Sequence, residues 1–382
     1  MFIYLIIYIP FVLCAYFDFI NTISKQKKGI LWFWVIVFTL FRGLRWDTGT
    51  DWDQFLEVYN HAHWDNIFSY YRNETEQLMD YGYMFINALF HEAGFSYTVF
   101  LLVTNFWIMW CYKEFSFRFT KYPILTFILL MNVGVPFPVR QTIAFATSLW
   151  GYRFLVEKKW ILYIIVTIVA GSIHKGSFIG FILIPIPFFL EKCCVRWWWY
   201  ASLYGASFVI ASLLSNYISL ILTIIAGSEG QLAVYSEAYM KNESLSVDYG
   251  DYNVSALNGM GYTIFFIVLL WIREKYKEIC KQRIKYFEVY FFMYAIVAVL
   301  DNMVRQGDES GMTEVLGRVT STIDMFPLIF PLLFTLLLPK YIKSREICFF
   351  VFFVYMLYKF WQQIPDGFYH DLFIPYKSVF EL

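Results

Sequence analysis

The sequence carries little charge for its length. Only 16% of its 382 residues are charged, against about 25% in a typical soluble domain, while 59% are hydrophobic and 23% are aromatic. This deficit excludes a soluble enzyme and favours lipid as the main solvent of the chain. The 30 basic and 30 acidic residues cancel, so the chain also lacks the basic surface that binds nucleic acid.

Cysteine is scarce as well. The six cysteines form no Cys-x-x-Cys motif and have no metal-ligand spacing to histidine, so neither a disulfide framework nor a zinc site is indicated. His61, His63 and Asp65 are close enough to suggest a metal site, but neighbouring histidines on an exposed amphipathic helix are usually solvated. We therefore expect no metal and no cofactor. Internal repeats and low-complexity linkers are absent too, which indicates one membrane domain over residues 1–382.

The hydrophobic residues are gathered in apolar stretches of about 17–25 residues, the length that crosses a bilayer as a helix. These stretches do not alternate polar and apolar residues as barrel strands do, and lipid then requires helices. We predict an all-α, polytopic integral membrane helical bundle with about twelve transmembrane helices. The expected spans are 3–23, 29–45, 95–112, 122–137, 139–156, 160–173, 176–190, 198–226, 260–272, 286–303, 319–338 and 346–361.

Basic residues divide the predicted loops into two sets. Twenty of the 30 lysines and arginines lie in alternate loops, at 25–28, 113–121, 153–159, 192–196, 273–285 and 340–345. The positive-inside rule places this set in the cytoplasm, and it places the remaining loops and both termini outside. The first span has no basic n-region and no small-residue cleavage site, so we expect it to be retained.

Two predicted outer segments are too long to be turns. The first, 45–83, contains Thr50-Asp51-Trp52-Asp53, a pattern that caps a helix, which we expect to run to Trp64. One face of this helix would carry Trp52, Phe55, Tyr59 and His63, and the opposite face Asp53, Glu57 and Asn60. Such a helix is expected to lie in the outer membrane interface. The second segment, 227–259, is polar and is expected to be a lid or a mobile loop over a cavity.

Ionisable residues near the outer leaflet are the candidates for chemistry. A charge at bilayer depth costs about 2.5–3.5 kcal/mol on insertion scales, so each one requires a partner or a function. The basic candidates are Arg42, Arg45, Arg140, the pair His174-Lys175, Arg305 and Arg318. Together they would hold an anion in one outer cavity. For a single arginine, anchoring to lipid phosphate or pairing with an acid, as in Asp301 and Arg305, is an equal explanation. Likewise Asp51 and Asp53 can be cap residues, and Trp52 and Tyr59 part of an aromatic belt.

Four motifs resemble those of one family. Residues 43–52, GLRWDTGTDW, closely resemble the "GxRxxxGTDxxxY" signature of EpsG-type proteins, the Wzy-like exopolysaccharide and O-antigen repeat-unit polymerases, with Phe55 nearer the aromatic position than Tyr59. Arg140-Gln141 with Ala144 is similar to the family's "(I/V)RQxxA" segment, residues 172–177 to its "xxHxSA" hairpin, and Gly317-Arg318 to the start of a late span. The resemblance runs from about residue 30 to 330, with a departure at Lys175, where a small or apolar residue is usual.

This resemblance implies a GT-C-like, metal-independent glycosyltransferase in the bacterial cytoplasmic membrane. Such an enzyme joins undecaprenyl-diphosphate-linked repeat units on the outer side of the membrane. It implies diphosphate binding by Arg140 and Arg318, supported by Arg45, Arg42 and Arg305. Asp51 or His174 would be the catalytic base, and Trp52, Phe55 and Tyr59 would stack on sugars.

The expected partners are lipid-linked oligosaccharides, the bilayer, and a chain-length regulator and flippase of the same pathway. Three alternatives stay open. A flippase of the same lipid-linked sugar would also need many spans and a basic cavity, although broken midplane helices and a two-fold repeat would mark it. A membrane O-acyltransferase would use His174 but would place acyl-CoA chemistry on the cytoplasmic side. The third alternative is a structural membrane scaffold.

Overall fold

The computed structural model describes residues 2–19, 26–49, 52–72, 77–131, 139–210 and 256–306, and toward the C-terminus 320, 322–333, 336, 347, 350–357 and 373–381. Regular structure in this part of the chain is helical except for one antiparallel pair of two-residue strands, β1 (Tyr71–Arg72) and β2 (Gln77–Leu78). The prediction of a helical bundle is therefore confirmed. The predicted count of about twelve transmembrane helices stays a prediction.

The described residues up to Ile173 form eight α-helices. They are α1 (Phe2–Phe19), α2 (Lys27–Gly43), α3 (Trp52–Asn60), α4 (Tyr81–Glu92), α5 (Tyr97–Phe119), α6 (Pro123–Met131), α7 (Val139–Val156) and α8 (Trp160–Ile173). The helices α7 and α8 have the bounds predicted for them, because Glu157, Lys158 and Lys159 interrupt the apolar sequence there. Among the described residues, α1 combines the length and the apolar composition needed to cross a bilayer, and α8 is equally apolar but shorter.

The described remainder of the chain contains helices that vary more in length and type. They are the 3₁₀ helix η1 (Lys175–Leu183), α9 (Ile186–Lys192), helical residues 197–210, α12 (Ala256–Lys275), α13 (Lys277–Arg283), α14 (Phe287–Gln306), α16 (Phe326–Ile329), helical residues 350–357 and the 3₁₀ helix η3 (Val379–Glu381). The prediction of one continuous helix over 176–190 is therefore wrong, because η1 and α9 divide this range. Pro185 and Pro187 explain this break, because proline lacks the N–H of a helix interior but fits the first turn of a new helix.

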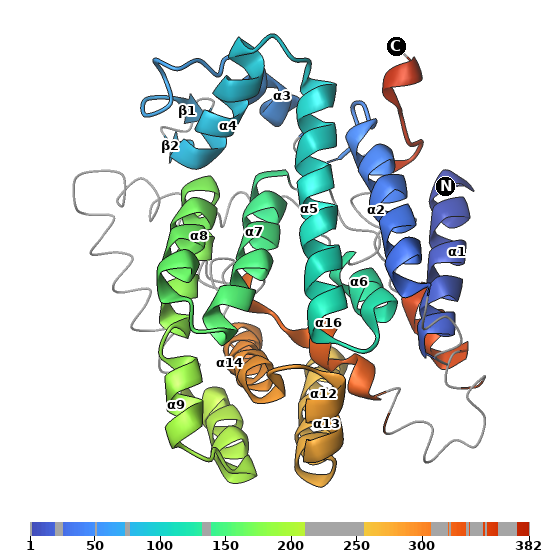
Figure 1. Cartoon of the computed structure of the whole chain (residues 1–382), viewed down its shortest axis with the longest axis vertical. Helices are drawn as coiled ribbons and strands as arrows, with labels where there is room; N and C mark the ends of the chain where they lie inside the picture. The colour runs from blue at the N-terminus through green and yellow to red at the C-terminus, as the bar shows by residue number, and fades with distance from the viewer. Residues whose placement is uncertain are drawn as a thin grey trace.

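The long helices stand side by side and carry a small cap at one end (Figure 1). In that view α5 runs down the middle, with α1 and α2 on one side of it and α7 and α8 on the other. The α2–α5 contact is close, because a Cβ at Gly43 would lie only 2.7 Å from Leu102 Cδ2. The helices α3 and α4 and the β1–β2 pair lie together above the bundle, whereas α9, α12 and α13 lie at its lower end.

Predicted basic loops among the described residues meet at that lower end, which we call the basic end. A bridge between Thr120 and Ile284 joins two of them. The Lys27 ammonium donates to the Lys121 carbonyl at 2.8 Å, which adds the first loop. Arg118 pairs with Glu157 at 2.7 Å, which adds the loop between α7 and α8. These four segments lie together in the structure, and their placement on the cytoplasmic side of the membrane stays a prediction.

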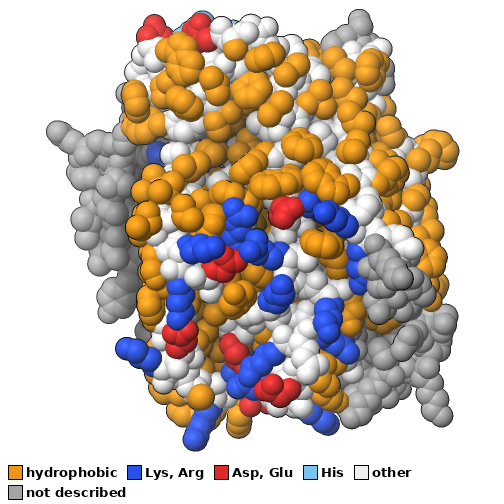
Figure 2. Space-filling model, in the orientation of Figure 1, with side chains coloured by type: hydrophobic (Ala, Val, Ile, Leu, Met, Phe, Trp, Pro, Cys, Tyr) orange, Lys and Arg blue, Asp and Glu red, His pale blue; other side chains and the backbone are white. Residues whose placement is uncertain are grey.

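Both termini lie at the opposite end. The Tyr4 hydroxyl donates to the Phe373 carbonyl at 2.8 Å, and the chain around Arg45 forms a bridge with Ser378. The expectation that the two ends of the chain share a side with the 45–83 segment is thus supported in the described residues. Figure 2 shows the same polarity on one face, where lysine and arginine gather in the lower half below a mostly hydrophobic band.

The segment 45–83 differs from the prediction in two ways. Its helix α3 ends at Asn60 and not at Trp64, because the Asn66 amide accepts from the His63 N–H at 3.0 Å and donates to the His61 carbonyl at 2.6 Å. These bonds hold the chain in a turn, and His63 is exposed. A further helix, α4, follows the strand pair and was not predicted. The buried face of α3 packs against α4 and α5, so its placement in a lipid interface stays a prediction.

Candidate functional site

The start of α4 is pressed against the end of α8. A Cβ at Gly82 would lie 2.2 Å from Ser172 Oγ and 2.8 Å from the Ser172 carbonyl carbon, so only glycine fits at this contact. This close approach brings Asp80, which directly precedes α4, beside His174, which directly follows α8. The packing of two helix ends therefore sets the position of the site.

Asp80 lies at the centre of three basic side chains. Its Oδ2 is 3.1 Å from Arg140 Nη1 and 3.8 Å from His174 Nδ1, and its Oδ1 is 3.9 Å from Lys175 Nζ. We call these four residues the Asp80 cluster. Two permanent cations thus face one carboxylate, and the imidazole adds a third charge when it is protonated. The cluster is suited to bind an anion, because its basic groups outnumber its acidic ones.

The Asp80 cluster is largely withdrawn from solvent. Asp80 is 5% exposed, whereas the side chain of Lys175 is 53% exposed and opens the cluster to the surface. In the part of the chain that the structure describes, both ring nitrogens of His174 are buried without a hydrogen-bond partner. A buried polar group without a partner is costly and often marks a place where a ligand or a water binds. His174 is therefore placed to exchange a proton with a bound group.

Arg45 occupies a second buried position at the same end. It lies 5.5 Å over the ring of Trp52, and its loop turns sharply at Gly49, whose φ of 114° favours glycine. The loop is held by the C-terminal segment, because the Lys377 carbonyl accepts from the Trp46 N–H at 3.0 Å. Arginine side chains stay protonated in proteins, so Arg45 brings a buried positive charge to this end of the bundle.

Tyr83 connects Arg45 with the Asp80 cluster. Burial raises the pKa of Tyr83 well above its usual value, and the nearby positive charges of Arg140 and Arg45 both act against that rise. The phenol thus lies within electrostatic reach of both arginines. The structure brings Arg140 and His174 together at Asp80, and Arg45 acts on Tyr83 in the first turn of α4. Their membership of one anion site stays a prediction. Arg42 is buried in the last turn of α2, three residues before Arg45.

The predicted sugar-stacking residues are part of the cap's core. Trp52, Phe55 and Tyr59 are buried, as their shared helix face predicts. Their rings contact other rings, with Trp52 5.2 Å from Tyr97 and Phe55 5.6 Å from Tyr83 between centroids. These contacts give the three residues a packing role, and sugar stacking by them stays a prediction.

Several predicted residues cannot be placed in the site. Asp51 and Arg318 lie outside the described residues, as do most of the 227–259 loop and the break before Arg140. Arg305 lies in the last turn of α14, whose backbone is described there. The proposed roles of Asp51, Arg305 and Arg318 therefore stay predictions.

Asp80 was missed in the sequence. Its signal is the run Asp80-Tyr81-Gly82-Tyr83, in which an acid precedes a helix and a glycine stands in the first turn. Glycine is unfavourable inside a helix by about 1 kcal/mol relative to alanine, and it therefore marks a close contact there. The C-terminal segment 373–381 was also missed. Nothing in its sequence indicates that it packs against the loop of Arg45.

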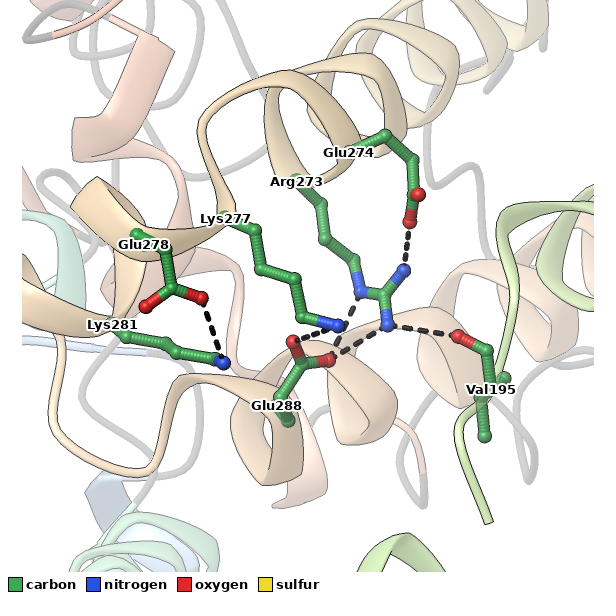
Figure 3. Close-up of polar contacts among 7 residues, drawn as sticks. All are labelled: Val195, Arg273, Glu274, Lys277, Glu278, Lys281 and Glu288. Carbon is green, nitrogen blue, oxygen red and sulfur yellow. Dashed lines mark hydrogen bonds and ion pairs between the residues drawn. The ribbon is translucent and has the colours of Figure 1, made fainter.

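A second charged cluster lies at the basic end. Figure 3 shows Arg273, which is 2% exposed, held by Glu288, Glu274 and the Val195 carbonyl. Arg273 Nη2 donates to Glu288 Oε2 at 2.8 Å and to the Val195 carbonyl at 2.9 Å, and Nε donates to the same Glu288 oxygen at 3.1 Å. The guanidinium also lies 4.9 Å over the ring of Tyr200. The guanidinium N–H groups and the guanidinium plane of Arg273 all contact protein. The cluster therefore has the geometry of an ion pair that stabilises the fold.

Comparison with known proteins gives one family. The family model described as the EpsG family matches residues 28–378, which is nearly the whole chain. A search of curated proteins and a search of solved structures each give no match.

Proposed function

Because the chain belongs to the EpsG family of Wzy-like polymerases, we propose that it polymerises lipid-linked oligosaccharide repeat units. The family is associated with polysaccharide polymerisation. The proposal adds the substrate, an oligosaccharide on undecaprenyl diphosphate, and the place of reaction, the outer side of the cytoplasmic membrane. The observation that carries it is the Asp80 cluster, a cation-rich, mostly buried site at the end of the bundle opposite the basic loops.

The reaction transfers a glycosyl group from one carrier to another. A sugar hydroxyl of one lipid-linked unit attacks the anomeric carbon of a second unit, and a C–O bond forms there. The bond from that carbon to the diphosphate oxygen breaks, and the electron pair leaves with undecaprenyl diphosphate. His174 takes the hydroxyl proton, an effect typically worth about 10²–10⁴ in rate. No change in oxidation state occurs.

Arg140 stabilises the leaving group in this scheme. Its planar guanidinium can donate two hydrogen bonds to phosphate oxygens, and these strengthen as negative charge grows in the transition state. Lys175 adds a second positive charge from the more exposed side of the cluster, and Arg45 adds a third from beyond Tyr83. Arg318 and Arg305 are proposed to complete the site. Positive charge from these side chains would do the work that a metal ion does in other transferases, so we expect activity in EDTA.

The test is a reaction of the purified protein in proteoliposomes with lipid-linked repeat units. The polymerase produces a ladder of longer sugars. A flippase moves the substrate across the bilayer without extending it, and this outcome would contradict the proposal. The matched control is Arg118→Ala, because Arg118 is an exposed arginine at the basic end and pairs with Glu157. Ladder formation should persist in this variant and should slow by about 10²–10³ in Arg140→Ala.

The membrane side of the site has its own test. Asp65 and Lys281 are exposed residues at the two ends of the molecule. In a cysteine-free background, an impermeant thiol reagent should label a cysteine at position 65 in intact cells, and one at position 281 only after permeabilisation. The reverse pattern would place the Asp80 cluster in the cytoplasm and contradict the proposed location.

A further inference from the structure

Asp80 stands where a helix cap is expected, yet it does not cap. It is the residue before α4, with the extended backbone of an N-cap, and its side chain accepts no hydrogen bond from the first turn of the helix. Aspartate at this position commonly makes such a bond, which is worth about 1 kcal/mol to the helix. Its carboxylate is turned instead toward Arg140, His174 and Lys175. Stability of α4 alone therefore does not explain its orientation.

The contacts of Asp80 are also loose. Only the Arg140 contact is within ordinary hydrogen-bond distance, at 3.1 Å, and the His174 and Lys175 contacts are 3.8 and 3.9 Å. Glu288 at the basic end holds Arg273 through two nitrogens at 2.8 and 3.1 Å. A buried ion pair stabilises a fold only when its geometry is close and complete. The Asp80 carboxylate therefore offsets the positive charge of its neighbours but does not hold them through a set of short hydrogen bonds.

We infer that Asp80 is a placeholder for the substrate diphosphate. In the empty site its carboxylate supplies a negative charge for the partly buried Arg140 and His174 and for the more exposed Lys175. When the substrate binds, the diphosphate oxygens replace it as the partner of Arg140 and Lys175. This inference rests on the proposed function and adds a positioning residue, with a defined role in binding and release, to that site.

The placeholder has two consequences for the reaction. Asp80 keeps Arg140 within the site before the substrate arrives, so less rearrangement is needed on binding. It also repels the diphosphate, because like charges a few ångströms apart in a poorly solvated site oppose each other strongly. The product, undecaprenyl diphosphate, retains the anionic group and would otherwise dissociate slowly. Asp80 therefore makes the site bind more weakly and turn over faster.

The test is the affinity of Asp80→Asn for undecaprenyl diphosphate in nanodiscs. The amide has the shape of the carboxyl group but no charge, so we expect binding about tenfold tighter than wild type, which corresponds to removal of one unfavourable charge interaction. In steady-state polymerisation KM and kcat should both fall, because product release slows. Asp80→Glu retains the charge and should bind within about threefold of wild type. The control is Asp65→Asn, which removes an exposed charge at the same end and should change neither quantity.

Other results would overturn the inference. Unchanged or weaker binding by Asp80→Asn, with or without a lower unfolding temperature, would mean that Asp80 is a structural ion pair or supports the site directly. Failure of the wild-type protein to bind undecaprenyl diphosphate would also reject it. The binding measurement does not depend on turnover, so it separates the two proposals. Tighter binding by Asp80→Asn in a protein that makes no polymer would support the placeholder and reject the polymerase.

Discussion

The two charged clusters of this protein differ in their balance of charge. At the basic end two cations, Arg273 and Lys277, meet two carboxylates, Glu288 and Glu274, and Arg273 also contacts a backbone carbonyl and aromatic faces. At the other end one anion, Asp80, faces three basic groups, two of which are beyond hydrogen-bond distance. In the first cluster two positive and two negative side chains balance. In the second the basic side chains outnumber the one carboxylate, and we propose that an anionic ligand binds there.

This difference separates a cluster that stabilises the fold from a cluster that binds a ligand. A complete buried cluster resists change, and its loss should lower stability. A cluster with surplus charge contributes less to stability and more to binding, because its energy is realised when the ligand arrives. Variants of the basic-end cluster should therefore change the unfolding temperature, and variants of the Asp80 cluster should change binding and turnover.

The largest expected effect is on stability, at the basic end. Arg273→Ala leaves Glu288 partly buried without its main partner, and breaking a buried ion pair in this way typically costs about 3–5 kcal/mol. We expect a markedly lower unfolding temperature in nanodiscs, with turnover per folded molecule unchanged. Lys281→Ala is the control, because its exposed pair with Glu278 should contribute less than about 1 kcal/mol. Normal stability of Arg273→Ala would contradict the structural role.

The next effect is on turnover, in the Asp80 cluster. Arg140→Ala should reduce the polymerisation rate by about 10²–10³, the usual loss when one donor to a developing charge is removed. Arg140→Lys should be nearly as slow, because lysine keeps the charge but loses the two-pronged hydrogen bond. Polymer length and the amount of single lipid-linked repeats, at matched protein levels, measure this. Near-normal polymer from Arg140→Lys would reduce Arg140 to an anchor.

A smaller effect on turnover is expected when the contact between Gly82 and Ser172, which positions the Asp80 cluster, is changed. Gly82→Ala introduces a Cβ that would lie 2.2 Å from Ser172 Oγ, which moves α4 away from α8 and Asp80 away from His174. We expect turnover to fall by about tenfold. A small displacement of a catalytic group is enough to cause a loss of this size. Gly29→Ala in α2 is the matched control, because a Cβ there would meet no atom within 4 Å. Equal turnover of the two variants would show that the α4–α8 contact does not position the site.

The sequence predicts the bundle better than the site, for a physical reason. The bounds of α7 and α8 follow from local composition, since the apolar runs end at charged residues. The gathering of the basic loops follows from a rule about lysine and arginine in short loops. Asp80 could not be found in this way, because its partners Arg140 and His174 are distant in the sequence and meet it only after α4 packs on α8.

The remaining differences also come from tertiary contacts. The early end of α3 depends on hydrogen bonds of Asn66, which a pattern of apolar residues does not reveal. The break between η1 and α9 was readable in Pro185 and Pro187, but strong hydrophobicity favoured one continuous span. Charge near the outer leaflet suggested one cavity for Arg140, His174 and Arg45, and the family resemblance suggested their roles. The structure places Arg140 and His174 beside Asp80, and the shared role of the three residues stays a prediction.

The central claim is that the lipid diphosphate binds at the Asp80 cluster and not at the basic end. Tyr81 and Tyr286 offer a matched pair for testing it, because both are 46% exposed and they lie beside Asp80 and beside the Arg273 cluster, respectively. Each can be replaced in turn by a photoreactive phenylalanine analogue and irradiated with a radiolabelled lipid-linked repeat unit. Our account predicts labelled protein from position 81, suppressed by excess undecaprenyl diphosphate, and only background labelling from position 286. Suppressible labelling from position 286, with none from position 81, would contradict it.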